Sequence, residues 1–257
     1  MNKISKDNFA LALGGGAARG AFHLGVLHFC EQHNININAY SGSSIGSIIA
    51  SSHASGVRAK EQLEIFTSKD LKKIFKFNYF RNGLFRIEQT SKIVEKLLPI
   101  KRLEELKKPV YICSYDLREK KLHYFEKGDI LPLCLASSAL IPLFRPIKYE
   151  NMSLIDGGFF DNIPIKPLEN KDYEIITIDL LPKREFTISK KFNPIKIFKR
   201  NFLKTLYENH SYSIKFSNHY LTSAHIRSFS LFTFKQLEDC FNLGFKEAQN
   251  HFLDIMK

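Results

Sequence analysis

The chain has 257 residues and a formal net charge of +12 at pH 7, and 44% of its residues are hydrophobic. This length and composition are typical of a globular protein with a sizeable core, and they exclude a disordered chain. The positive charge favours anionic partners and solubility but does not bear on fold. No run of about 18 uncharged apolar residues is present, so the sequence predicts no membrane span.

The start of the chain and its cysteines indicate a cytoplasmic protein. Residues 1–7 lack the apolar centre of a secretory signal peptide. The four cysteines are scattered without Cys-x-x-Cys spacing, so we expect buried, reduced thiols rather than disulfides or zinc ligands. They are Cys30, Cys113, Cys134 and Cys240. The nine histidines show no metal-ligand spacing, and we expect no metal or other cofactor.

A glycine-rich turn follows the first predicted strand, residues 9–13, and opens a predicted helix. Its sequence is GGGAARG over residues 14–20. Backbone N–H groups beside a helix N-terminus suit a developing oxyanion. A dinucleotide-binding loop needs Gly-x-Gly-x-x-Gly and an acid about 20 residues later, and this turn has neither. A P-loop is excluded because no Gly-Lys-Ser/Thr follows.

A second turn, GSSIG over residues 42–46, follows an apolar run over residues 37–40. Gly-x-Ser-x-Gly after a strand is a nucleophile elbow, in which a strained serine presents its oxygen at a helix N-terminus. Taken alone, the pattern also fits a tight strand-to-helix turn with no chemistry. A serine aimed at a carbonyl and an oxyanion hole together predict acyl transfer.

The remaining chain alternates predicted helices and strands. Helices are expected over residues 45–55, 86–98, 129–140 and 233–256, and strands over 109–115, 122–126 and 174–181. This alternation predicts an α/β fold with three layers, in which helices cover both faces of a mainly parallel sheet.

A third group of motifs follows the two glycine turns in the sequence. It comprises ASSALIP at residues 136–142, LIDGG at 154–158 and DNIP at 161–164. With the two glycine turns, these motifs closely resemble the patatin-like phospholipase family over residues 8–182. That family combines an oxyanion loop containing an arginine, a Gly-x-Ser-x-Gly elbow, an Ala-Ser-x-Ala-x-Pro segment and Asp-Gly-Gly or Asp-Gly-Ala.

The resemblance implies a patatin-like fold and a Ser–Asp dyad, with Ser44 as nucleophile and Asp156 as base. It implies an oxyanion hole formed by the backbone of Gly15 and Gly16 with support around Arg19. The other motif glycines are Gly42 and Gly46 of the elbow and Gly157 and Gly158 after the base. Many members carry a fourth glycine where this chain has Ala17. Alanine disfavours a positive φ, so we expect the loop to turn without one there.

The chemistry of the dyad fits these residues. A serine hydroxyl is a poor nucleophile without an adjacent base, and burial of Asp156 would raise its pKa and improve it as a base. On its own, an aspartate before two glycines also fits a plain turn. Asp161 and Asn162 are expected to order the turn that follows.

Two basic segments bear on the substrate. Residues 66–85 contain six aromatic residues interleaved with lysine and arginine, which fits either a membrane-interface surface or a packed cap. Residues 183–204 contain eight basic residues against one glutamate. Within them, an amphipathic helix over 194–208 fits either an anionic membrane surface or packing on the core. We expect a catalytic domain over 8–182 and a basic, helical extension over 183–257 packed on it.

The predicted function is a metal-independent lipid acyl hydrolase of the phospholipase A or lysophospholipase type. Its predicted partners are phospholipid or lysophospholipid and, peripherally, anionic membrane; no nucleic acid is expected. One alternative is a Ser–His–Asp esterase or acyltransferase with His210, His219 or His225 as base. Another is a catalytically idle membrane-binding protein. Head group, acyl position, chain length and oligomeric state do not follow from the sequence.

Overall fold

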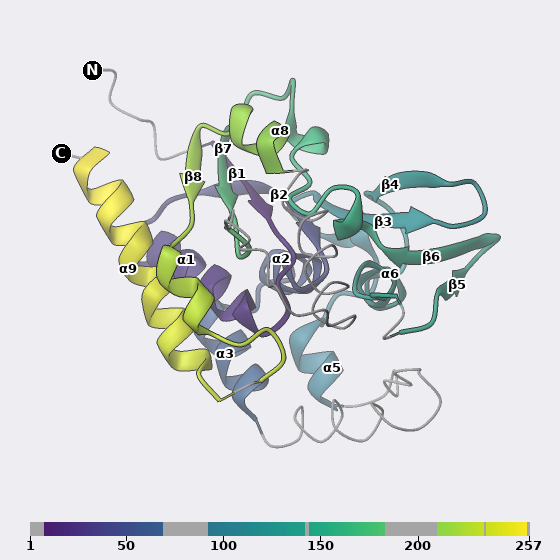
Figure 1. Cartoon of the computed structure of the whole chain (residues 1–257), viewed down its shortest axis with the longest axis horizontal. Helices are drawn as coiled ribbons and strands as arrows, with labels where there is room; N and C mark the ends of the chain where they lie inside the picture. Colours follow the sequence, from purple (N-terminus) through teal and green to yellow (C-terminus); the bar gives the residue numbers. More distant parts are fainter. Residues whose placement is uncertain (1–7, 69–91, 142–143, 183–209, 234, 256–257) are drawn as a thin grey trace, which may run out of the picture.

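The computed structural model describes residues 8–68, 92–141, 144–182, 210–233 and 235–255 (Figure 1). Its centre is an eight-stranded sheet flanked by helices. Five strands pair in parallel in the order β3-β2-β1-β7-β8, and β4, β5 and β6 join them through antiparallel pairs. The predicted α/β fold with a mainly parallel sheet is confirmed.

The strand bounds are β1 (Phe9–Leu13), β2 (Ile37–Ser43), β3 (Val110–Asp116), β4 (Lys121–Phe125), β5 (Ile147–Tyr149), β6 (Met152–Asp156), β7 (Glu174–Ile178) and β8 (His219–Leu221). The described α-helices are α1 (Ala21–Gln32), α2 (Ile45–Ala54), α3 (Ala59–Thr67), α5 (Lys92–Leu97), α6 (Ile130–Ser137), α8 (His210–Lys215) and α9 (Leu237–Ile255). Short 3₁₀ helices include η1 (Ala17–Gly20), η3 (Gly157–Phe159), η4 (Lys166–Leu168) and η5 (Ala224–Ser228).

Most of the predicted elements occur in the structure. The helices α2, α6 and α9 and the strands β3, β4 and β7 lie within a few residues of the predicted ranges. Helix α5 is the described part of the helix expected over 86–98. The basic helix expected over 194–208 lies outside the described residues, as does most of the aromatic and basic stretch over 66–85.

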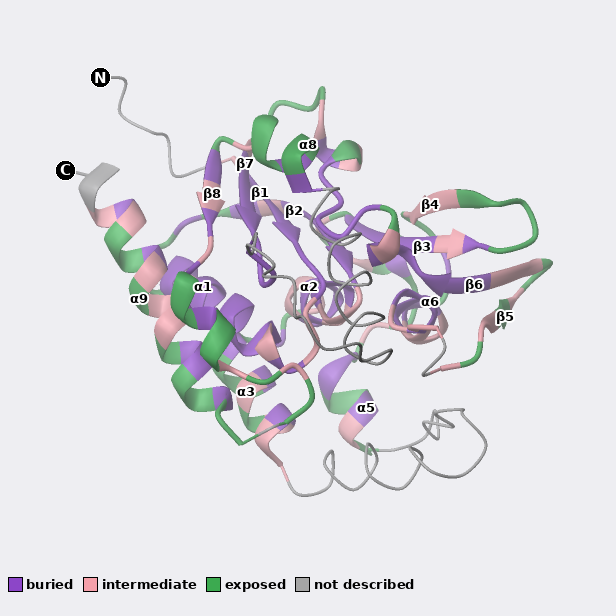
Figure 2. Cartoon of the chain, viewed as in Figure 1, coloured by how far each residue is buried: buried purple, intermediate pink, exposed green. Residues whose placement is uncertain are grey.

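Strand β1 is buried on both faces of the sheet (Figure 2). Because successive side chains of a strand point to opposite faces, Phe9, Leu11 and Leu13 enter the larger core. Ala10 and Ala12 enter a smaller core with the segment around η4. These small side chains let that segment lie close to the sheet. All four cysteines are buried and free, as predicted.

The C-terminal part of the described chain is built into this architecture. Strand β8 pairs with β7, and α9 packs along α1 (Figure 1). The boundary expected at residue 182 stays a prediction, since the residues that follow it lie outside the described part.

Two glycines allow α1 and α9 to pack closely. A Cβ atom on Gly25 would overlap the carbonyl oxygen of Phe241, and one on Gly244 would overlap that of Phe22. Backbone atoms cannot move aside as a flexible side chain can. Close packing of the two helices therefore requires glycine at both positions.

Gly244→Ala should lower the free energy of unfolding by about 1–3 kcal/mol, the usual cost of overpacking. In an unobstructed helix the same change would stabilise by up to about 1 kcal/mol, because alanine has the higher helix propensity. Urea denaturation followed by circular dichroism measures the difference. A stabilised Gly244→Ala protein would contradict the close packing of α1 and α9.

Candidate active site

Ser44 lies in a strained turn between β2 and α2. Its φ is 51° and its ψ is −125°, a backbone conformation that a non-glycine residue adopts only when its surroundings enforce it. A Cβ on Gly46 would overlap the carbonyl oxygen of Leu13, and one on Gly42 would lie 2.5 Å from the carbonyl carbon of Gly46. The two glycines therefore let the backbone close tightly around Ser44, as a nucleophile elbow requires.

Strand β3 brings the end of β2 and the end of β6 together. The pairing with β2 ends at Ser43 opposite Cys113, and the antiparallel pairing with β6 ends at Asp156 opposite Ser114. Strand β4 occupies the other edge of β3 over residues 112–116. Because a strand has only two edges, β2 and β6 share one edge and meet end to end. This meeting places Asp156 beside the elbow.

The last turn of α6 holds both chain ends in place. The hydroxyl of Ser137 donates to the carbonyl oxygen of Cys113 at 2.6 Å and accepts the N–H of Ser44 at 2.9 Å. The carbonyl oxygen of Ala139 accepts the N–H of Asp156 at 3.1 Å. The ASSALIP motif thus bonds to the main chain of both predicted catalytic residues, a role that its sequence did not indicate.

The carboxyl group of Asp156 is buried and hydrogen-bonded, with a residue exposure of 5%. Its Oδ1 accepts the N–H of Gly158 at 2.8 Å and the hydroxyl of Ser43 at 3.5 Å, and the Ser44 side chain lies near enough to lower the pKa of the carboxyl group. Burial raises the pKa of Asp156 to about 7, and these hydrogen bonds oppose the rise without cancelling it. Asp156 therefore lies beside Ser44 as a buried carboxyl group with a raised pKa.

The glycine-rich loop lies against the elbow, and its first two peptides are bonded on their inner side. Gly14 N–H donates to Ile178 O and Gly15 N–H to Asn162 O, both at 3.1 Å. The imidazole of His23 lies 2.7 Å from Gly14 O, and burial lowers the pKa of His23 to about 4, so the neutral ring donates its Nε2 proton. An ideal Cβ on Gly15 would lie 3.3 Å from the Cβ of Ser44.

The next two N–H groups of the loop, those of Gly16 and Ala17, differ from that of Gly15. Both residues are half-buried, whereas Gly15 is buried, and neither N–H donates to another described residue. Ala17 has a φ of 49°, so the expectation that the loop would turn without a positive φ here is wrong. The N–H of Ala18 donates to Leu231 O at 3.0 Å, and this long-range bond holds the turn in a conformation that costs about 1–2 kcal/mol for alanine.

Arg19 fastens this loop to later segments of the chain. Its guanidinium donates to the carbonyl oxygens of Phe229, Leu180 and Arg227 at 3.0, 3.1 and 3.4 Å. Arg19 therefore supports the loop by donating hydrogen bonds to main-chain carbonyl groups beside it.

The three histidines considered as alternative bases lie in different surroundings. His210 bonds Asp179 and Asn162, and His219 bonds Glu174 and His251 at the opposite end of β7. His225 is exposed in η5.

One group of side chains in the described part of the chain has metal-ligand geometry. Ligand atoms of Asp116, Glu119 and His123 lie within 4.8 Å of one another in the β3–β4 hairpin. The carboxylate of Asp116 accepts the N–H groups of Arg118, Glu119 and Ser153 at 2.9–3.3 Å. These bonds give Asp116 a structural role in holding the hairpin against β6.

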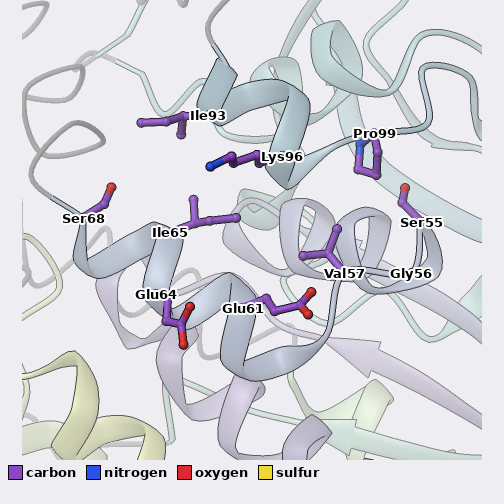
Figure 3. A pocket seen from close by; sticks show the side chains of 10 residues that line it. All are labelled: Ser55, Gly56, Val57, Glu61, Glu64, Ile65, Ser68, Ile93, Lys96 and Pro99. Carbon is purple, nitrogen blue, oxygen red and sulfur yellow. The ribbon is translucent and has the colours of Figure 1, made fainter.

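A cavity of about 550 Å³ lies between α3 and α5 (Figure 3). It is lined by Ser55, Gly56, Val57, Glu61, Glu64, Ile65, Ser68, Ile93, Lys96 and Pro99. Ser55 follows the C-terminal end of α2, while Ser44 precedes its first residue, so ten helical residues, about 15 Å, separate them. The cavity therefore does not adjoin the Ser44–Asp156 pair. No helix among the described residues is long and apolar enough to cross a bilayer.

Comparisons with known proteins identify the family of the chain. The family model described as patatin-like phospholipase matches residues 11–169. An uncharacterized NTE family protein of Mycobacterium tuberculosis is 28% identical over 167 residues, which cover 64% of this chain and 46% of that protein. Lysophospholipase NTE1 of Candida albicans is 26% identical over 189 residues, which cover 69% of this chain and 13% of that protein.

The crystal structure of VipD from Legionella pneumophila is similar in fold. The TM-score is 0.55 at 15% sequence identity, and the match covers 96% of this chain and 67% of that chain. The chain spans less than half the length of the two sequence relatives.

Ser137→Ala should lower the free energy of unfolding by about 1–3 kcal/mol, because it leaves the N–H of Ser44 without its acceptor. Ser138→Ala is the matched control. The Ser138 hydroxyl is buried without a hydrogen-bond partner among the described residues, so its removal should change stability by less than about 0.5 kcal/mol. Denaturant titrations of both variants test this difference, and equal losses would contradict the bonding role of Ser137.

Proposed function

The chain belongs to the patatin-like phospholipase family, and we propose that it cleaves carboxylic esters of lipids through an acyl-Ser44 intermediate. The observation that carries the proposal is the buried carboxyl group of Asp156 beside Ser44 in its strained elbow. A serine with a positive φ is held at the start of a helix, a base lies against it, and a loop with accessible N–H groups lies beside it. These are the parts that acyl transfer needs.

In the first step, Asp156 takes the hydroxyl proton of Ser44 as Oγ attacks the ester carbonyl carbon. A base with a pKa near 7 accepts this proton more readily than one near 4, and about half of it is still ionised at neutral pH. The tetrahedral intermediate collapses as the C–O bond to the alcohol breaks, and Asp156 returns the proton to the leaving alcohol. Asp156 then deprotonates a water molecule that attacks the acyl-serine, and it returns this proton to Ser44 Oγ as the acyl C–O bond breaks and the fatty acid is released.

The oxyanion donors in this mechanism are the N–H groups of Gly16 and Ala17. The family resemblance of the sequence implies Gly15 and Gly16 for this role. In the structure, however, the Gly15 N–H is bonded to Asn162 O and the residue is buried. Gly15 therefore supports the loop, and Arg19 supports it from the other side. Donors held in place before the reaction stabilise the transition state without reorganisation.

The substrate class that we propose is phospholipid or lysophospholipid. The family and the name of the lysophospholipase relative support it. A cytoplasmic location, peripheral contact with anionic membrane and the lack of nucleic-acid binding stay predictions from the sequence.

Ser44→Ala and Asp156→Asn should each lower kcat for a lysophospholipid or a soluble ester by several orders of magnitude. The double variant should be little worse than either single variant, because members of one catalytic unit fail together. Asp161→Asn is the matched control, since Asp161 is also buried, has a pKa raised to about 6 by burial, and bonds Tyr124 instead of a serine. We expect its kcat to stay within about tenfold of wild type.

A fluorophosphonate probe, with the labelled residue identified by mass spectrometry, tests the nucleophile independently of the substrate. Labelling at Ser44 that is lost in Ser44→Ala supports the proposal. A folded wild-type protein that is neither labelled nor active on esters would instead be a catalytically idle member of the family.

The raised pKa of Asp156 predicts two pH effects. The value of kcat/KM should rise with pH through an apparent pKa near 7, because only the ionised carboxylate accepts the serine proton. Stability should change in the opposite direction. Between about pH 4 and 7 the folded state binds more protons at Asp156 than the unfolded state, so its contribution to stability falls as pH rises.

Asp156→Asn removes this titration. Its gain in unfolding free energy over wild type should be small near pH 4, grow to on the order of a few kcal/mol by pH 7, and stay constant above. Thermal and chemical unfolding across pH measure this difference. A gain that does not vary with pH would contradict the raised pKa.

A further inference from the structure

A chain of buried polar side chains lies behind the oxyanion loop. Asp179, which follows β7, bonds the Nδ1 of His210 through its Oδ2 at 3.2 Å. The Nε2 of His210 lies 3.3 Å from the Nδ2 of Asn162, which in turn donates to Gly15 O at 3.4 Å. The exposures of Asp179, His210 and Asn162 are 0%, 4% and 3%. This series of hydrogen bonds therefore connects Asp179, His210 and Asn162 to the peptide of Gly15 in the loop.

The donors and acceptors in this chain fit only one order. Burial alone would raise the pKa of Asp179, but hydrogen bonds from His210, Tyr220 and the Leu181 N–H outweigh it and hold the pKa below its usual value. The ionised carboxylate accepts only, so the Nδ1 of His210 carries the proton. The Nδ2 of Asn162 donates to Gly15 O and carries a second N–H, which the Nε2 of a neutral His210 ring accepts.

Asn162 holds Gly15 from two sides. Its side chain donates to Gly15 O, and its main-chain oxygen accepts the Gly15 N–H at 3.1 Å. A trans peptide is planar, with its C=O and N–H pointing in opposite directions. The bond that draws Gly15 O toward Asn162 therefore turns the N–H of Gly16 away from Asn162, to the accessible side of the loop.

We propose that Asp179, His210 and Asn162 are positioning residues that act together to orient the oxyanion donor Gly16. The proposal rests on the proposed function, because it assigns a role within that mechanism. His210 contributes an acceptor to Asn162 and has no part in proton transfer from Ser44. From the sequence alone, Asn162 is expected only to order a turn, and His210 is only an alternative base.

Two isosteric variants separate positioning from stability. His210→Gln puts an amide oxygen near the Nε2 position, which keeps the acceptor for Asn162 and loses the donor to Asp179. His210→Asn puts its amide near the Nδ1 position, which keeps the donor to Asp179 and loses the contact with Asn162. If His210 positions Asn162, His210→Gln should have the higher kcat, although His210→Asn should unfold at the higher temperature.

The experiment first establishes that wild type hydrolyses the ester and is labelled at Ser44. Asn162→Ala and His210→Asn should then lower kcat by about ten- to hundredfold with KM changed by less than about threefold, because the oxyanion donor acts in the transition state. In the Asn162→Ala background, His210→Asn should have no further effect on kcat, since His210 acts through Asn162.

His219→Asn is the matched control, because His219 is buried and bonds a glutamate and a histidine at the far end of β7. It should lower the unfolding temperature and leave kcat unchanged. If His210→Asn does not fold, His210→Ala, which also loses the contact with Asn162, takes its place in the double-mutant cycle. Additive effects, equal kcat for both His210 variants, or a loss in His219→Asn as large as in His210→Asn would overturn the proposal. An inactive, unlabelled wild type would instead overturn the proposed function.

Discussion

The site depends on one geometric constraint, the shared edge of β3. Strands β2 and β6 pair with this edge from opposite directions and stop at adjacent residues, Cys113 and Ser114. Neither strand can extend without colliding with the other, so both chains leave the sheet at this point. One departs through the elbow at Ser44 and the other through the turn after Asp156. The two chain ends that meet at this edge of β3 therefore also carry the two residues of the proposed dyad.

Burial at this point has opposite consequences for stability and for chemistry. The carboxyl group of Asp156 lies within the protein, where the charged form is poorly solvated, and its pKa rises for that reason. The same rise makes it a better proton acceptor at neutral pH. Ser44 and Ala17 add backbone strain that the surrounding hydrogen bonds sustain. Conflicts of this kind between local preference and fold are typical of functional sites.

The loop beside Ser44 is held by parts of the chain that follow the motifs in sequence. Arg19 donates to the carbonyl group of Leu180, which precedes β8 in the sequence, and to that of Phe229, which follows it. The N–H of Ala18 donates to Leu231 O, and Asn162 connects the loop to His210. Residues 210–255 thus support the loop as well as extend the sheet and cover α1. A protein truncated after the family motifs would lose these contacts.

The alternation of helices and strands, the elbow around Ser44 and the motif order that identifies the family all follow from the amino-acid sequence. These features are local, because side-chain periodicity and glycine-flanked turns are properties of a few neighbouring residues. The short strands β5 and β8 are not predicted, since three residues carry little periodic signal. Three features are visible only in the folded protein. The Gly15 N–H donates to Asn162 O, Ala17 has a positive φ, and Ser137 bonds the main chain at Ser44. Each of these depends on hydrogen bonds between residues far apart in the chain, and no local pattern specifies which distant partner will be present.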